Sequence, residues 1–363
     1  TLLLKPTDEP TYEKIKSPEY TKKLNPNSIK VSYLDGPKVE ITGDILEENT
    51  IEFLDDLDNL IYSTVIKTNM WTTCSRRYFT KWKIKVNGKI VDEFDPNGKR
   101  VLIALESKSL GDTIAWTPYA VEFAKVNKCK VVLSTFHNYF FEGIEEYKDI
   151  EFINPGSSTD CYAVYRIGWF RDDNGGWKDF SRHPTQVNTV PLQKTSCDIL
   201  GLEYRELNFG VNLKKGERPI SEKYVVFGPQ STAGFKEWSY DHWKSLSSLI
   251  RDLGYSVVIT TKTPYYLDGC KNVWGESLET IANYLHHADA FVGLTSGLSW
   301  LNWSLGKYSY VIDGISRPGF LFQENSTKIY NDNVCIFCAS DEVFAFDAGD
   351  WDWCPVYKGT EKQ

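Results

Sequence analysis

The sequence has few methionines, no long apolar run and no excess of positive charge, and each shortage argues against a class of protein. No apolar stretch approaches the roughly 18 residues that cross a bilayer, and the apolar start of the chain is too short for a secretory signal. A formal net charge of -8 and an isoelectric point near 5.3 oppose a broad basic face for nucleic acid. We therefore expect a cytoplasmic enzyme with no membrane insertion and no nucleic-acid partner.

The sequence does not begin with an initiator methionine. Met70 is the single methionine and the sequence begins with Thr1, a pattern typical of a processed or partial product. Its 363 residues are 41% hydrophobic and 14% aromatic, enough to bury a large core. We expect two or three domains.

The eight cysteines do not suit a secreted disulfide framework. Five are scattered singly, as buried reduced thiols would be: Cys74, Cys129, Cys161, Cys197 and Cys270. Cys335, Cys338 and Cys354 instead cluster near the end, with a Cys-x-x-Cys spacing that suits tetrahedral coordination of iron or zinc by thiolates. We expect a fourth ligand either beyond Gln363 or from elsewhere in the chain. We expect a cysteine metal finger over residues 331–363.

The first part of the chain has the pattern of short β-strands. Residues 29–44 and 82–96 alternate apolar and polar side chains around Asp-Gly and Asn-Gly, which favour tight hairpin turns. Residues 51–66 supply two further strand candidates. The pattern predicts a β-rich accessory domain over residues 1–97, built as a sandwich or barrel.

The next part alternates strands and helices. Residues 101–107 form an apolar run without alternation, typical of a strand covered on both faces, and a helical pattern follows it. Further strand candidates lie at 130–136, 150–155 and 161–169. The polar segment 170–186 is expected to be unpacked, and with the helical segment 190–202 it would mark the crossing to a second lobe.

A second series of strands and helices begins near residue 224. Strands are predicted at 224–229, 255–261, 290–292 and 308–313, and helices at 240–253, 278–287 and 300–305. The fold class expected is α/β, with mostly parallel sheets in two Rossmann-like lobes at residues 98–215 and 216–330. A cleft should separate the lobes.

The loop after the first buried strand is the first candidate site. Ligands in open α/β sheets gather at the carboxyl ends of the strands, so Gly111, Asp112 and Thr113 should face the cleft. A sugar transfer needs a carboxylate to accept the proton of the attacking hydroxyl, and Asp112 could serve as that general base. An Asp at this position more often merely caps its helix.

Two loops of the second lobe are the other candidates. The first follows the strand at 290–292 and opens a helix, so that its free N–H groups and hydroxyls could bind a diphosphate. It contains Thr295, Ser296, Gly297, Leu298 and Ser299. Glycine here would let the backbone approach the anion closely, although an ordinary helix cap fits equally well.

The second of these loops follows the strand at 224–229. It contains Gly228, Gln230, Ser231 and Lys236. Lys236 could neutralise the leaving phosphate, although an isolated lysine is usually solvated surface. No Asp-x-Asp pair is apparent at a strand end near these loops, and Asp172-Asp173 lies in the polar segment. We therefore expect no divalent metal in catalysis, with Lys236 and the helix terminus stabilising the leaving group.

Three stretches of the sequence resemble one known family. They are GKRVLIALESKSLGDTIAWTPY, GLTSGLSWLNWSLGK and FDAGDWDWCPVYKGTEKQ. They are similar to the bacterial autotransporter strand-loop-strand O-heptosyltransferases over nearly the whole chain. The resemblance implies a GT-B glycosyltransferase of inverting type, an iron-binding cysteine finger and a ring-like homo-oligomer such as a dodecamer. It also implies transfer of heptose from ADP-heptose to serine hydroxyls of an acceptor protein such as an autotransporter passenger.

The resemblance also implies roles for individual residues. Asp112 matches the family's catalytic base, Lys236 its donor-binding lysine, and the Thr295–Ser299 loop its phosphate side. Cys335, Cys338 and Cys354 match three of four iron ligands. The family usually continues with another cysteine, and Tyr357 stands where its tail commonly has histidine.

Other functions are compatible with the same pattern. One alternative is a GT-B transferase that uses another nucleotide sugar or a glycan acceptor, because one scaffold hosts many donors. A second is a catalytically silent carbohydrate-binding or assembly protein. A nucleotide-sugar epimerase is disfavoured because the first loop lacks the G-x-G-x-x-G pattern of a dinucleotide site.

Overall fold

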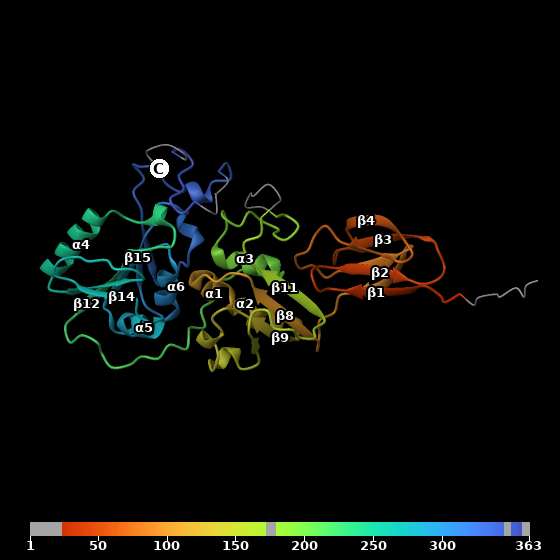
Figure 1. Ribbon diagram of the computed structural model, residues 1–363, viewed down its shortest axis with the longest axis horizontal. Helices are drawn as coiled ribbons and strands as arrows, with labels where there is room; N and C mark the ends of the chain where they lie inside the picture. Colours follow the sequence, from red (N-terminus) through yellow and green to blue (C-terminus); the bar gives the residue numbers. More distant parts are fainter. Residues whose placement is uncertain (1–23, 172–178, 345–349, 358–363) are drawn as a thin grey trace, which may run out of the picture.

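The computed structural model describes residues 24–171, 179–344 and 350–357. Three regions follow one another along the long axis: a β-rich domain at one end, a first α/β lobe in the middle and a second α/β lobe at the other end (Figure 1). The tail lies over the second lobe. Within the described residues, no helix has the length and apolar character to span a membrane.

The β-rich domain consists of two antiparallel sheets. One has the order β1 (Ser28–Ser32), β2 (Lys38–Thr42), β5 (Met70–Thr73), and the other β4 (Leu60–Lys67), β3 (Glu48–Leu54), β6 (Lys83–Val86), β7 (Lys89–Glu93). The two expected hairpins and the two further strand candidates are confirmed, while β5 was not expected. Asn87 and Gly88 both have positive φ, as a two-residue turn of type I′ requires.

The first lobe contains a parallel sheet of four strands in the order β10, β9, β8, β11. These are β8 (Arg100–Leu105), β9 (Lys130–Ser134), β10 (Glu151–Ile153) and β11 (Ala163–Ile167), with helices α1 (Leu110–Trp116), α2 (Pro118–Asn127) and α3 (Leu192–Ile199). The strand β8 alternates buried and half-buried residues, so the expectation that both of its faces are fully covered is only partly right.

The described part of the polar segment before α3, residues 179–186, is packed, contrary to expectation. His183 is buried, and Arg182 forms two hydrogen bonds with Asp35, at 2.9 and 3.2 Å. Asp35 lies between β1 and β2 and also accepts from Arg77 at 2.9 Å, so this carboxylate joins the β-rich domain to the first lobe. The helix α3 packs on α1 and β11, and the chain changes sheets only after it, in residues 203–223.

The second lobe contains a parallel sheet of six strands in the order β14, β13, β12, β15, β16, β17. The strands are β12 (Tyr224–Gly228), β13 (Ser256–Thr261), β14 (Lys271–Trp274), β15 (Ala290–Leu294), β16 (Ser309–Ile312) and β17 (Ser326–Ile329). The helices are α4 (Tyr240–Asp252), α5 (Leu278–His287) and α6 (Gly297–Ser304). The expected elements are present, and β14 and β17 are additional.

Strand order determines where a ligand can bind. In the first lobe the strands after β8 are added on one side and β11 on the other, so the strand order switches between β8 and β11. In the second lobe it switches between β12 and β15. Such switch points open a crevice at the carboxyl ends of the strands. The loops that follow these four strands therefore carry the candidate site.

Candidate active site between the two lobes

Asp112 lies in the first turn of α1, and its carboxylate is held from two sides. Its Oδ2 accepts hydrogen bonds from Ser107 Oγ at 2.6 Å and from Trp169 Nε1 at 2.8 Å. The N-cap of α1 is Ser109. The two donors lie on segments that follow β8 and β11. The helix-capping alternative does not explain why the Asp112 carboxylate is held by these side chains.

Burial dominates the electrostatics of Asp112. The residue is 7% exposed, and burial raises the pKa of its carboxyl group. The hydrogen bonds from Ser107 and Trp169 and the charge of Lys236 lower this pKa and oppose part of the rise. A carboxylate with a raised pKa is a stronger base than an ordinary aspartate.

Lys236 approaches Asp112 from the second lobe. It ends a 3₁₀ turn, Gly234–Lys236, and its Nζ donates to the carbonyl of Thr295 at 3.2 Å. Burial lowers the pKa of its ammonium group, while the charges of Asp313 and Asp112 raise it. The structure thus brings together three of the predicted loops, those of Asp112, Lys236 and Thr295.

The loop between β15 and α6 offers one unused hydroxyl. Ser296 is the N-cap of α6, and its Oγ is buried without a hydrogen-bond partner among the described residues. Ser299 Oγ donates to the carbonyl of Leu294 at 2.5 Å, so its proton is already engaged. Of the expected hydroxyl donors, Ser296 is therefore better placed for a ligand than Ser299.

Two of the three predicted site glycines, Gly111 and Gly297, lie where α1 and α6 pack together. A Cβ on Gly297 would lie 3.0 Å from Leu110 Cβ and 3.2 Å from the nitrogen of Gly111. A Cβ on Gly111 would lie 2.9 Å from Trp300 Cδ1. These short distances show that α1 and α6 cross at close range between the lobes. The approach of an anion to the Gly297 backbone stays a prediction.

The other predicted cleft residues have mostly structural contacts. A Cβ on Gly228 would lie 3.0 Å from Leu298 Cδ2, and the Thr113 hydroxyl donates to the carbonyl of Ser109 at 3.0 Å. Gln230 Nε2 donates to Thr263 Oγ1 at 2.8 Å, and Ser231 Oγ accepts from the nitrogen of Ala233. These residues shape the loops around the site.

Asp313 and Trp169 were not anticipated. Asp313 follows β16, is 3% exposed, and its Oδ1 accepts the N–H groups of Ile315 and Ser316 at 3.2 and 3.1 Å. Burial raises the pKa of its carboxyl group, and Lys236 is among the groups that oppose the rise. An acidic residue directly after a buried parallel strand is the signal that could have identified it.

A cavity in the first lobe lies away from these charges. It has a volume of about 480 Å³ at the carboxyl ends of β9 and β10, lined among others by Phe136, Tyr139 and Glu142. Among the described residues its lining includes none of the predicted site residues. The candidate site therefore depends on the convergence of loops, not on the size of a cavity.

All eight cysteines are free thiols, but only Cys74 and Cys197 of the scattered ones are fully buried. In the tail, burial and the nearby Cys335 and Cys354 raise the pKa of Cys338, so the three thiols occupy one region. Within residues 24–171, 179–344 and 350–357, however, no group of three or more metal-ligating side chains is arranged to hold an ion. The expected finger is therefore not seen as a formed metal site.

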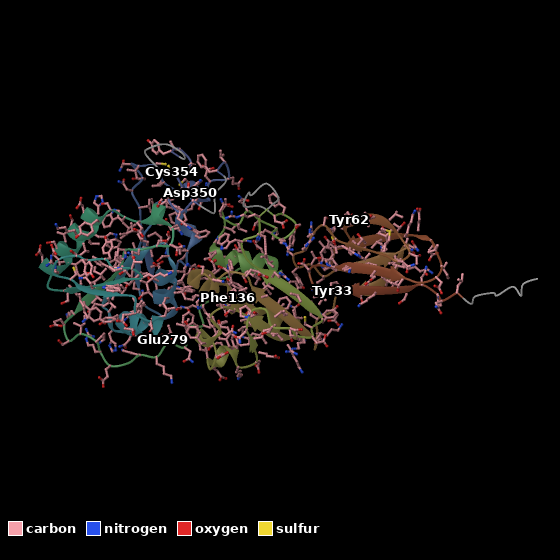
Figure 2. The ribbon with its side chains drawn as sticks, in the orientation of Figure 1. Tyr33, Tyr62, Phe136, Glu279, Asp350 and Cys354 are labelled. Atoms are coloured by element: carbon pink, nitrogen blue, oxygen red, sulfur yellow. The ribbon has the colours of Figure 1, made fainter. Side chains whose placement is uncertain are left out.

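The tail contains an Asp-x-Asp pair that the sequence analysis missed. Asp350 and Asp352 lie in it, and Figure 2 shows Asp350 near Cys354. The Asp352 carboxylate contacts the position that a Cβ on Gly234 would take, beside the Lys236 turn. Among the described residues this pair follows no strand directly, so it is not the strand-end pair that the sequence analysis considered. Asp172-Asp173 lies outside the described residues.

Comparison with known proteins identifies relatives over the whole length. Residues 194–343 match glycosyltransferase family 9 (heptosyltransferase). The autotransporter heptosyltransferase Aah of Escherichia coli is 31% identical, with 90% of this chain and 85% of that protein covered. The heptosyltransferase BAHTCr of Citrobacter rodentium is 30% identical over 96% of this chain and 88% of that protein. An autotransporter heptosyltransferase of Burkholderia thailandensis described as inactive, BimC, is 28% identical.

A solved relative has the same architecture. The iron-containing dodecameric glycosyltransferase TibC of enterotoxigenic E. coli superposes with a TM-score of 0.81 and 27% identity, covering 99% of this chain and 94% of TibC. TibC has also been solved in complex with ADP-D-β-D-heptose. With relatives of at least 30% identity covered over more than two thirds of their length, this chain belongs to the autotransporter heptosyltransferases and is a glycosyltransferase.

Proposed function

We propose that this protein transfers heptose from ADP-heptose to serine hydroxyls of an acceptor protein, with Asp112 as the general base. The observation that carries the proposal is that Asp112 and Lys236 approach each other from opposite lobes. They are close enough that the charge of each shifts the pKa of the other. The complex of TibC with ADP-heptose supports the donor. The family's association with autotransporters supports an autotransporter passenger as acceptor.

The environment of Asp112 suits proton abstraction. Both of its side-chain hydrogen bonds go to Oδ2, which leaves Oδ1 for the acceptor hydroxyl. In the proposed step, Asp112 takes the serine proton as the serine oxygen forms a bond to the anomeric carbon. The bond from that carbon to the diphosphate breaks, and ADP leaves with the electron pair. Attack on the face opposite the leaving group inverts the anomeric centre.

Lys236 and the start of α6 suit the leaving diphosphate. The Lys236 ammonium lies beside the Thr295 carbonyl, and the unpartnered Ser296 hydroxyl is at the N-cap of the same loop. Free N–H groups at a helix N-terminus and a buried cation both stabilise negative charge as it develops. Asp313 and Asp112 favour the charged form of Lys236 against the effect of burial. The proposal therefore needs no divalent cation in the catalytic step.

We further propose that iron binds at Cys335, Cys338 and Cys354, with zinc as the alternative. Thiolate donors suit either metal, and the iron-containing TibC favours iron. A tetrahedral site needs a fourth ligand, and the described residues do not present a formed site, so no catalytic step depends on this metal. Metal analysis of the purified protein and of Cys338→Ser tests the assignment. A full complement of metal in Cys338→Ser would contradict it.

A homo-oligomer in the cytoplasm completes the proposal. Dodecameric TibC supports a ring-like assembly, as do exposed apolar side chains on the β-rich domain such as Leu60, Val65 and Trp71. Eight free thiols suit a reducing compartment. Light scattering of the purified protein should give a mass several times 41.6 kDa. A monomer would contradict the assembly.

One alternative, a catalytically silent carbohydrate-binding or assembly protein, has a specific observation in its favour, because the relative BimC is described as inactive. Release of nucleotide from ADP-heptose, UDP-sugars and GDP-sugars, each with and without a serine-rich passenger fragment, separates the possibilities. We expect ADP release that depends on the fragment. Release from another donor alone would overturn the substrate, and release from none would favour the silent protein.

A further inference from the structure

The tail contacts the second lobe through two short segments, and both reach loops of the candidate site. The first is the 337–340 segment. The nitrogen of Phe337 donates to the carbonyl of Gly314 at 2.8 Å, and that of Ala339 to Ile315 at 3.1 Å. Ser340 is 1% exposed, and its Oγ accepts the N–H of Arg317 at 3.0 Å. These bonds hold the loop that directly follows Asp313.

The second is the 351–353 segment, which lies against the turn that carries Lys236. The nitrogen of Phe235 donates to the carbonyl of Trp351 at 3.1 Å. The ring of Trp353, 3% exposed, meets the Phe235 ring edge-on at 6.2 Å between centroids. Asp352 contacts Gly234 in the same turn.

The Lys236 turn has few internal contacts of its own. Its backbone bonds are those of a three-residue 3₁₀ turn, from the nitrogen of Lys236 to Ala233 and from that of Glu237 to Gly234. A single 3₁₀ turn is weak in isolation, so its geometry depends on what packs against it. In this protein the 351–353 segment packs there.

The tail also reaches the first lobe and the surroundings of the base. Asn188 Nδ2, on a residue 4% exposed, donates to the carbonyl of Ala339 at 2.9 Å. Phe320, in the 3₁₀ turn after the Asp313 loop, stacks with Trp169 at 6.5 Å between centroids, and Trp169 donates to Asp112. The 337–340 segment therefore contacts the Asp313 loop directly and the first lobe at Asn188, and it is linked to Asp112 only indirectly, through Phe320 and Trp169.

We propose that the 337–340 and 351–353 segments are positioning elements, which hold Lys236 and the Asp313 loop in the geometry that binds the donor diphosphate. Trp353 and Ser340 are the positioning residues. They act through the loops they contact and do not touch substrate. The inference rests on the proposed function, because it concerns the same donor site. It requires that loosening the tail weaken nucleotide binding in a protein that remains folded.

The matched pair Trp353→Ala and Trp351→Ala tests this inference in the full-length protein. Both remove an indole, but Trp351 is 51% exposed and its contribution to the turn is a backbone carbonyl that alanine keeps. The dissociation constant for ADP is measured by calorimetry, beside the thermal midpoint. We expect Trp353→Ala to bind ADP about tenfold more weakly, because small misplacements of binding groups are costly. Trp351→Ala should bind within about twofold of the parent.

Hydrogen exchange separates this inference from the proposed function. In the nucleotide-free protein, Trp353→Ala should lose protection at residues 234–237, and Ser340→Ala at residues 314–317. If the variants lose this protection but the parent protein does not bind ADP, the positioning role stands and the proposed donor is wrong. ADP binding by the parent that is unchanged in Trp353→Ala would overturn the positioning role.

A folding defect is also distinguishable. Trp353→Phe keeps an aromatic ring against Phe235 and should restore ADP binding toward that of the parent. A purely structural role for the tail would lower the thermal midpoint of both Trp353→Ala and Ser340→Ala and leave their ADP affinity unchanged. That result contradicts the inference. Ser340→Ala alone suffices if Trp353→Ala does not fold.

Discussion

At the scale of residues, the buried carboxylate of Asp112, the proposed general base, has a cost in stability. Burial raises its pKa, so the ionised form that a base requires is disfavoured by the fold. A group whose pKa is raised on folding contributes most stability at low pH, and the contribution is lost as the pH rises through the folded pKa. Ionised Asp112 therefore destabilises the fold near neutral pH.

Asp112→Asn tests both consequences. It should lower transfer by about 10²–10⁴-fold because the base is lost, and leave ADP-heptose affinity nearly unchanged because the shape is kept. At pH 7 its thermal midpoint should exceed that of the parent, and the difference should shrink at lower pH, where Asp112 takes up its proton. Rate, calorimetric and unfolding measurements check these outcomes. Undiminished turnover would remove Asp112 from the mechanism.

Lys236 should act on the donor before the chemical step. Lys236→Ala should weaken ADP binding about tenfold or more, since hydrogen bonds to charged groups contribute about 1.5–3 kcal/mol. Lys271→Ala is the matched control, because Lys271 is exposed in β14 of the same lobe. Calorimetry with ADP compares the two. Equal affinities in both variants would refute the phosphate role of Lys236.

Part of the candidate site could be predicted from the sequence alone. Asp112 and Lys236 could be proposed because they follow strand candidates directly in the sequence. Asp313 carries the same local signal, because it directly follows β16, but its interaction with Lys236 depends on how loops of the second lobe pack, which no local pattern shows. Close approach to an anion and close helix packing require the same small residue, so the anion-binding role expected of Gly297 stays a prediction beside its packing role.

At the scale of elements, the crossing of α1 and α6 sets how closely the lobes approach. Gly297→Ala should lower the free energy of unfolding by about 1–3 kcal/mol, because its Cβ overlaps Leu110 and Gly111. It should also reduce transfer, since the same helices carry Asp112 and the Ser296 loop. Gly319→Ala is the control, because a Cβ there meets nothing within 4 Å. Chemical denaturation that finds the two variants equally stable would contradict the tight crossing.

The segment around His183 predicts a pH dependence of stability. Burial lowers the pKa of His183 to about 4 from its usual 6.5, opposed by Asp179. A histidine with a lowered pKa stabilises the fold above its unfolded pKa, and this stability is lost as the pH falls from about 6.5 towards 4. The loss should amount to about 3 kcal/mol.

His183→Gln provides the comparison for that prediction. Glutamine can still accept the bond that His183 Nε2 receives from the nitrogen of Phe170 at 3.3 Å, but it does not titrate. Denaturant unfolding at pH 7 and pH 4.5 should show a smaller decrease in the variant than in the parent. Equal decreases would exclude His183 as the source.

Most strands and helices could be predicted because hydrophobic periodicity is local. The hairpin turns at Gly36 and Asn87-Gly88 and the alternation of strands and helices after residue 98 are confirmed. The packed segment 179–186 was mistaken for a free loop, since its Arg182 finds its partner, Asp35, 147 residues away. The edge strands β14 and β17 are four residues each and have too little pattern to be recognised.

At the scale of the whole molecule, the β-rich domain, the two lobes and the tail are tied by a few polar and aromatic contacts. Asp35 links the β-rich domain to the first lobe, the α1–α6 crossing links the lobes, and the tail contacts loops of both. The fold class could be expected from the order of the elements. The contact of the tail with the Lys236 turn could not, because it joins segments more than 100 residues apart.

In our proposal, Asp112 and Lys236, which meet between the lobes, serve as the base and the diphosphate-binding group for heptose transfer to protein hydroxyls. Tandem mass spectrometry of a serine-rich passenger fragment, incubated with ADP-heptose and either the parent protein or Asp112→Asn, tests it most directly. We predict heptose-sized increments on serine residues with the parent and none with Asp112→Asn. A fragment left unmodified by a parent protein that binds ADP-heptose, or one modified equally by both, would contradict the account.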